Sequence, residues 1–198
     1  MHYLVISSLI LCCRLCLAGD FPEDTKDIQF LNAKQASDLV AEYRGNKLNL
    51  NGITSIDEDV AKELANYKGE TLYLRGLASI SKSVAHELVN FKGLELYLHG
   101  LDSIDKDVAQ QLAMFQGRSL YLNALFSIDK DVAKELAKFK GNLLFLLGLT
   151  FIDRDVAQEF TKFKGTALFL SVPKSIDRDV LEILKSNPAI LLPEKYRD

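Results

Sequence analysis

The stretch of sequence that decides the fold lies in the middle of the chain and recurs along it. Residues 85–108 read AHELVNFKGLELYLHGLDSIDKDV, and residues 133–156 read AKELAKFKGNLLFLLGLTFIDRDV. The same pattern runs through six units with a period of 24 residues. A fixed period of this length indicates a repeat protein whose units stack into a solenoid.

Glycine marks the repeat most clearly. Ten of the eleven glycines fall into two columns with this spacing. The first column is Gly45, Gly69, Gly93, Gly117, Gly141 and Gly165, and the second is Gly52, Gly76, Gly100 and Gly148, with Ala124 and Val172 in the remaining places. We expect the first column to supply the left-handed residue that ends each helix.

Each unit combines a strand pattern with a helix pattern. Leu72-Tyr73-Leu74 alternates with period two, which predicts a short strand whose leucines point inward. In Asp105-Lys106-Asp107, the first aspartate is a suitable N-cap and the second lies in the first helical turn. One unit cannot bury its apolar face alone, whereas a stack of six can.

The Leu-x-Leu-x-Gly-Leu segment followed by a helix resembles a leucine-rich repeat of a divergent bacterial type, over roughly residues 33–185. Where that family carries Asn or Cys after the strand, this chain has Ile53, Leu77, Leu101, Leu125, Leu149 and Pro173. The resemblance implies a right-handed α/β solenoid with parallel strands on the concave face and helices on the convex face. It also implies a binding or scaffolding role.

The ends of the chain depart from the repeat. Residues 1–18 hold an apolar run of about eleven residues followed by small residues, which is too short to span a bilayer and typical of a secretory signal peptide. The alternatives are an uncleaved hydrophobic anchor and a frayed cap strand. Residues 19–32 would form an N-terminal cap, residues 33–180 six repeats, and residues 181–198 a C-terminal cap. We therefore expect an exported protein: secreted, periplasmic or on the cell surface.

Composition narrows the partner class. The 198 residues carry a net charge of −3, with 48% hydrophobic and 26% charged residues, which excludes a disordered chain and a polytopic membrane protein. The slightly acidic balance argues against nucleic acid, because phosphate binding favours a basic surface. All three cysteines lie within the first sixteen residues, so removal of the signal leaves no disulfide.

The residues between the leucines should point out of the strand face in three columns. The first is Lys47, Thr71, Glu95, Ser119, Leu143 and Ala167; the central one is Asn49, Tyr73, Tyr97, Tyr121, Phe145 and Phe169; the third is Asn51, Arg75, His99, Asn123, Leu147 and Ser171. With parallel strands about 4.8 Å apart, the five central aromatics would form a ladder. Such a ladder suits a peptide, a glycan or a partner's apolar edge. The alternative is that it only stabilises the sheet.

A second aromatic column follows the helices, and we expect it to lie in the core. It consists of Tyr43, Tyr67, Phe91, Phe115, Phe139 and Phe163.

Five side chains from neighbouring strands form the candidate polar part of the site: Arg75, Glu95, Tyr97, His99 and Asn123. A recognition patch is the favoured interpretation, and an acid–base site is the remote alternative. Toward the C-terminus the strand face turns apolar at Leu143, Phe145, Leu147 and Phe169, which predicts a partner or self-association surface.

No motif favours a metal, a cofactor or catalysis. Helix capping explains the five Asp-x-Asp pairs and the Ser81/Ser83 pair better than calcium binding, because Lys or Arg separates the aspartates in four of the pairs. Zinc-ligand spacing, a nucleophile elbow and a glycine-rich phosphate loop are missing from the sequence. We expect a non-enzymatic binding module for a protein, peptide or glycan. The alternative is an assembly protein that self-associates through the apolar half of the strand face.

Overall fold

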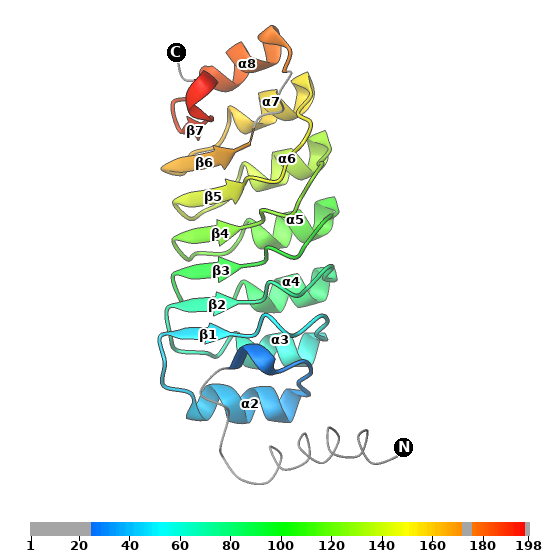
Figure 1. The fold of residues 1–198 in the computed structure, drawn as a ribbon, viewed down its shortest axis with the longest axis vertical. Helices are drawn as coiled ribbons and strands as arrows, with labels where there is room; N and C mark the ends of the chain where they lie inside the picture. Colours follow the sequence, from blue (N-terminus) through cyan, green and yellow to red (C-terminus); the bar gives the residue numbers. More distant parts are fainter. Residues whose placement is uncertain (1–24, 172–175, 197–198) are drawn as a thin grey trace, which may run out of the picture.

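The computed structural model describes residues 25–171 and 176–196. These residues form an elongated column of coils, with strands along one side and helices along the other (Figure 1). Seven strands make one parallel sheet in chain order. This confirms the predicted α/β repeat solenoid. The predicted signal segment, the start of the predicted N-terminal cap, Val172 and Pro173 lie outside the described residues.

Strands and helices alternate along the chain. The strands are β1 (Lys47–Asn49), β2 (Thr71–Tyr73), β3 (Glu95–Tyr97), β4 (Ser119–Tyr121), β5 (Leu143–Leu146), β6 (Ala167–Leu170) and β7 (Ile190–Leu191). The helices are η1 (Thr25–Asp27), α2 (Ala33–Glu42), α3 (Glu58–Leu64), α4 (Lys82–Leu88), α5 (Lys106–Leu112), α6 (Lys130–Leu136), α7 (Arg154–Phe160), α8 (Arg178–Lys185) and η2 (Glu194–Tyr196), where η denotes a 3₁₀ helix.

The register of the sheet places each strand residue beside its counterpart in the next coil. Leu72 pairs with Leu96, and Tyr73 pairs with Tyr97. The same register continues to β6, where Phe145 pairs with Phe169. A residue type that recurs at the same position of successive coils therefore lies beside its own kind in the sheet.

Strand β7 was not predicted, because Pro188 and Pro193 break the repeat pattern. The two prolines flank the strand without interrupting it, and the Leu168 N–H donates to the Ala189 carbonyl across 2.8 Å. Proline is tolerated at such flanking positions because it removes no donor from the pairing.

Leucine and aromatic columns build the core. Leu72, Leu74 and their counterparts are fully buried, as predicted. The aromatic column after the helices is also buried, except for half-buried Tyr43 at its N-terminal end, which confirms its place in the core. Within this column, the Tyr67 and Phe91 rings lie 5.9 Å apart and nearly parallel.

The glycine columns have a different cause from the one expected. No described glycine has a positive φ, so the predicted left-handed helix ends are wrong. An added Cβ on Gly117 would clash with the Phe115 ring and would lie 2.7 Å from the Gly93 carbonyl oxygen of the preceding coil. Glycine is therefore required by the close approach of the coils and of the core ring.

Helix capping follows the prediction in five coils and fails in one. Each of the first residues of these pairs accepts a hydrogen bond from the backbone N–H three residues later, at 2.8 to 3.2 Å: Asp57, Ser81, Asp105, Asp129 and Asp153. Asp177 makes no such bond, so capping does not explain its pair.

The second aspartate of the pair has a separate role. Asp107, Asp131 and Asp155 form ion pairs with the lysine of the preceding coil at 3.1, 3.6 and 3.3 Å. The same arrangement joins Arg154 to Asp179 at 3.9 Å. The basic residue at the start of one helix thus pairs with the second aspartate of the next coil. Each of these exposed ion pairs contributes at most about 1 kcal/mol to stability.

Among the described residues, no helix is both long enough and apolar enough to cross a lipid bilayer.

We predict that Gly117→Ala lowers the free energy of unfolding by about 1–3 kcal/mol, the usual cost of overpacking a core. Urea unfolding followed by circular dichroism measures the loss. Gly45→Ala is the control, because the three atoms nearest its added Cβ all belong to the side chain of half-buried Tyr43 at the end of the stack, and none is backbone of another coil. Equal losses in the two variants, or a gain in stability for Gly117→Ala, would contradict the packing explanation.

Candidate functional site

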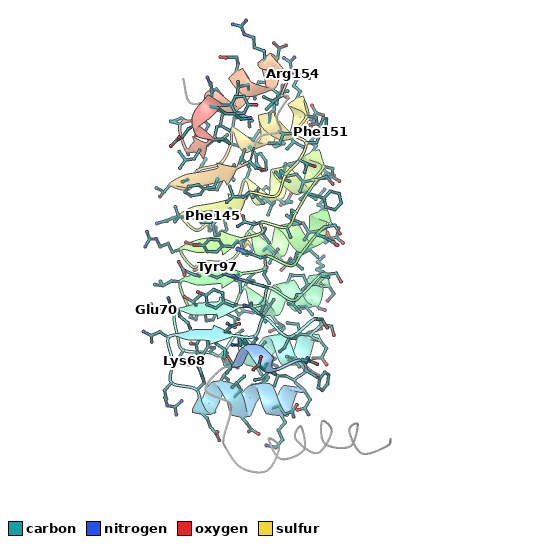
Figure 2. The ribbon with its side chains drawn as sticks, viewed as in Figure 1. Lys68, Glu70, Tyr97, Phe145, Phe151 and Arg154 are labelled. Carbon is teal, nitrogen blue, oxygen red and sulfur yellow. The ribbon has the colours of Figure 1, made fainter. Side chains whose placement is uncertain are left out.

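The central column of the strand face forms an unbroken ladder of rings. Ring centroids are 4.4 Å apart for Tyr73 and Tyr97, and 3.9 Å apart for Tyr97 and Tyr121. The remaining two steps, Tyr121 to Phe145 and Phe145 to Phe169, are both 4.3 Å. All five rings are half-buried. Figure 2 shows Tyr97 and Phe145 on the strand side of the column.

The rings of the ladder cover one another. From Tyr97 to Phe169 successive planes differ by only 2° to 9°, so each inner ring has a neighbour on both faces. At one end, Arg75 lies against the rings of Tyr73 and Tyr97; at the other, Phe169 pairs in register with Leu191. The inner rings, Tyr97, Tyr121 and Phe145, therefore present their edges to solvent, because another ring covers each of their faces.

The first column is more buried than its outward position predicts. Thr71, Ser119 and Ala167 are buried, whereas Glu95 and Leu143 between them are half-buried. Small and large residues thus alternate from coil to coil, and the larger ones shield the smaller ones. Glu95 accepts hydrogen bonds from the Thr71 hydroxyl at 3.3 Å and the Tyr97 hydroxyl at 3.4 Å.

Two asparagines of the third column join successive coils. The Asn51 side-chain oxygen accepts from the Arg75 N–H, and that of Asn123 accepts from the Leu147 N–H, both at 3.1 Å. The family that the repeat resembles carries its Asn or Cys two positions later, and the described residues there are buried and apolar: Ile53, Leu77, Leu101, Leu125 and Leu149. The signal was present as Asn51 and Asn123 themselves.

Among the described residues, Arg75 is the one cation that contacts the rings of the ladder. Its Cζ lies 5.1 Å from the centroids of both Tyr73 and Tyr97, which is the range of a cation–π contact. The side chain is exposed, and no acidic group among the described residues pairs with its guanidinium. Arg75 therefore presents its donors to solvent from a defined place.

His99 lies beside Arg75 and is partly enclosed by the ladder. Its ring is 5.3 Å from Tyr97 and 5.6 Å from Tyr121, and its Nε2 is 3.4 Å from the Asn123 amide nitrogen. Nδ1 is buried and has no hydrogen-bond partner among the described residues. Burial, followed by the charge of Arg75, lowers the pKa of His99, while the Tyr121 backbone opposes this shift. These two effects favour the neutral form of the imidazole.

The polar residues do not assemble into an acid–base pair. Glu95 is bonded to Thr71 and Tyr97, and no carboxylate of the described chain hydrogen-bonds to His99. Nor does the described part of the chain bring together three His, Cys, Asp or Glu side chains that could hold a metal ion. What the cluster offers is a fixed cation, polar groups and ring edges, which together are suited to recognition.

The C-terminal half of the strand face is apolar. Leu147 is 48% exposed, and Phe145 and Leu143, two and four residues before it on the same face, are half-buried. The sequence interpretation missed two other exposed apolar side chains, Phe126 (52%) and Phe151 (65%), in the turns before α6 and α7. Their signal was available, because Phe151 replaces a serine found at the same place in the other coils.

Phe151 borders a hollow of about 400 Å³ on the helix side of the column, away from the ladder (Figure 2). Its lining is Thr150, Phe151, Ile152, Asp153, Arg154, Ile176, Asp177 and Val180.

The chain matches no model of a known protein family, and no curated protein matches it either.

We predict that the stability of the protein falls as the pH rises above about 10. Burial first, then Tyr121 and Glu95, raise the pKa of Tyr97 well above its usual value. Tyrosines of the unfolded chain lose their protons near pH 10. The unfolded state then binds fewer protons than the folded state, and stability decreases with pH. Stability from this group is complete below about pH 10 and is lost as the pH approaches the raised value.

Urea unfolding at several pH values tests this with Tyr97→Phe, which removes the titrating hydroxyl and keeps the ring. The variant should lose stability less steeply than the parent protein above about pH 10. Measurements near pH 8 provide the baseline for each protein. Identical slopes would show that Tyr97 ionises no differently in the folded and unfolded chains.

Proposed function

We propose that this protein is a non-enzymatic binding module that recognises a protein partner, or a peptide segment of one, on its strand face. The observation that carries the proposal is the third column, where five different side-chain types over six coils lie beside the repeated ring ladder. Its exposed or half-buried members include Arg75, His99, Asn123 and Leu147. A repeated ladder supplies rigid contact area, and the variable column beside it supplies specificity.

The stacking of the ladder favours a protein over a glycan. A sugar that packs on an aromatic ring needs a free ring face, and inner rings 3.9 to 4.3 Å apart offer none. Ring edges and the exposed Leu147 instead suit apolar side chains and backbone groups of a polypeptide.

The wider setting of the proposal comes from the sequence. The strand–turn–helix units favour a divergent leucine-rich repeat, and the N-terminal apolar segment favours export by a signal peptide. A secreted, periplasmic or surface-bound module would meet its partner outside the cytoplasm.

Self-association is the second candidate function. It is favoured by Leu147, which is 48% exposed on the same face as Phe145 and Leu143, because an apolar patch of this kind is typical of interfaces. In that case, copies of the chain would pair through the C-terminal half of the strand face.

We predict that Leu147→Asn weakens partner binding at least about tenfold and leaves thermal unfolding nearly unchanged, since the residue is half exposed. A partner copurified with the protein is identified and expressed, and its Kd is measured by calorimetry. Met114→Asn is the matched control, because Met114 is 45% exposed and follows α5 on the helix side. Equal losses for the two variants, or none for Leu147→Asn, would count against the strand face.

Light scattering coupled to size exclusion separates the two candidate functions. A binding module should remain monomeric at high protein concentration, because no second copy is needed. A concentration-dependent dimer that Leu147→Asn dissociates, and Met114→Asn does not, would favour self-association instead.

A further inference from the structure

We propose that the strand face binds an extended, acidic peptide segment, with one carboxylate on Arg75 and an apolar side chain four residues away on Leu147. The inference rests on the function proposed above and adds the chemistry of the partner. Its basis is the placement of these two residues in one column and the lack of a counter-charge for Arg75.

The guanidinium of Arg75 is positioned but not neutralised. Two tyrosine rings hold it at 5.1 Å, and no described acid pairs with it. Four other cations, Lys82, Lys106, Lys130 and Arg154, have aspartates from the next coil. Arg75 is thus a cation whose planar donors are available to a ligand carboxylate, for which a bidentate contact is the preferred geometry.

Glu95 does not take the place of that ligand. Its Oε2 already accepts from the Thr71 hydroxyl of the first column and from the Tyr97 hydroxyl of the ladder. The charge of Arg75 instead reaches His99, where it contributes to the lowered pKa. An incoming carboxylate would find a fixed donor fork with no competing anion.

The spacing of the column selects an extended chain. Arg75 and Leu147 are three coils apart, which corresponds to about 14 Å at the usual strand spacing. An extended peptide advances about 3.3 Å per residue, and alternate side chains point the same way. Residues i and i+4 therefore span about 13 Å on one side and reach both positions, while residue i+2 lies over His99 and Asn123. The peptide runs along the stack and crosses the strands.

The charge of the face favours a single carboxylate over a polyanion. The three columns contain two cations, Lys47 and Arg75, and one anion, Glu95. Sulfated glycans and nucleic acids bind through many cations at once. The apolar C-terminal half would also contribute nothing to such a ligand, whereas it suits the second anchor of a peptide.

A displayed library of random nine-residue peptides, selected on the purified protein, tests the inference. We expect enrichment of Asp or Glu at one position and Leu, Ile or Phe four residues away. The enriched peptide should bind at least about tenfold more weakly when its acid is changed to Asn or Gln, as for the loss of a charge-assisted hydrogen bond. Fluorescence anisotropy of the labelled peptide gives the Kd.

Variants of the protein assign the carboxylate to Arg75. Arg75→Gln should lower the affinity for the acidic peptide as much as changing the peptide's acid to Asn or Gln does. When the two changes are combined, we expect no further loss of affinity. Arg75→Lys keeps the charge and should retain part of the affinity. Lys62→Gln removes one positive charge at an exposed position of α3, on the helix side, and should leave the affinity for the peptide unchanged. Thermal unfolding of each variant shows that the fold is intact.

The other outcomes separate this inference from the proposed function. Enriched peptides without an acid that still depend on Leu147 would overturn the carboxylate assignment and leave strand-face binding intact. Peptides insensitive to both Arg75→Gln and Leu147→Asn would overturn both proposals. An absence of enrichment would overturn the peptide assignment. So would a heparin hexasaccharide that binds through Arg75 more tightly than any selected peptide.

Discussion

In-register stacking is the constraint on which the rest of this structure depends. From β1 to β6, each residue of a strand lies beside its own counterpart 24 residues later, as the Leu72–Leu96 and Tyr73–Tyr97 pairs show. Apolar columns are stabilised by this arrangement, because each apolar side chain packs on an apolar side chain of the next coil and is covered by it. Charged columns would lose, because identical charges would stack. The chain avoids this near the helix starts by offsetting the contact by one residue, so that Lys106 meets Asp131 and not Lys130.

The same constraint divides the strand face into a structural part and a part free to vary. In the central column, repetition turns five aromatic residues into a stack whose faces are occupied, so the ladder stabilises the sheet whatever it binds. In the first column, small and large residues alternate and fill one another's space. The third column also changes along the stack, with five residue types in six coils, and unlike the first column its described members from Arg75 onward are all exposed or half-buried. Arg75 and Leu147 belong to that column, and they are its exposed members.

Much of the fold followed from periodicity alone. The 24-residue period, the inward leucines and the buried aromatic column were all readable because each is repeated, and repetition makes a weak local signal strong. The sequence-based predictions were wrong where the role of a residue depends on a neighbouring coil. The glycines are required by the approach of an adjacent backbone and ring, as Gly117 shows, and not by their own dihedral angles. Asp177 resembles the other caps in sequence but makes no capping bond.

The candidate site shows the same division. The sequence by itself determined which side chains share the strand face, because the period of two in a strand and the period of 24 in the chain place Tyr97, Arg75 and Leu147 in defined columns. Only the tertiary structure decided what each column offers to a ligand. The rings of neighbouring coils lie closer together than the strands that carry them, so their faces are hidden. The conformation of the Arg75 side chain places its guanidinium on two of these rings. Such contacts arise between coils, through space, and therefore cannot be read from the order of residues within one.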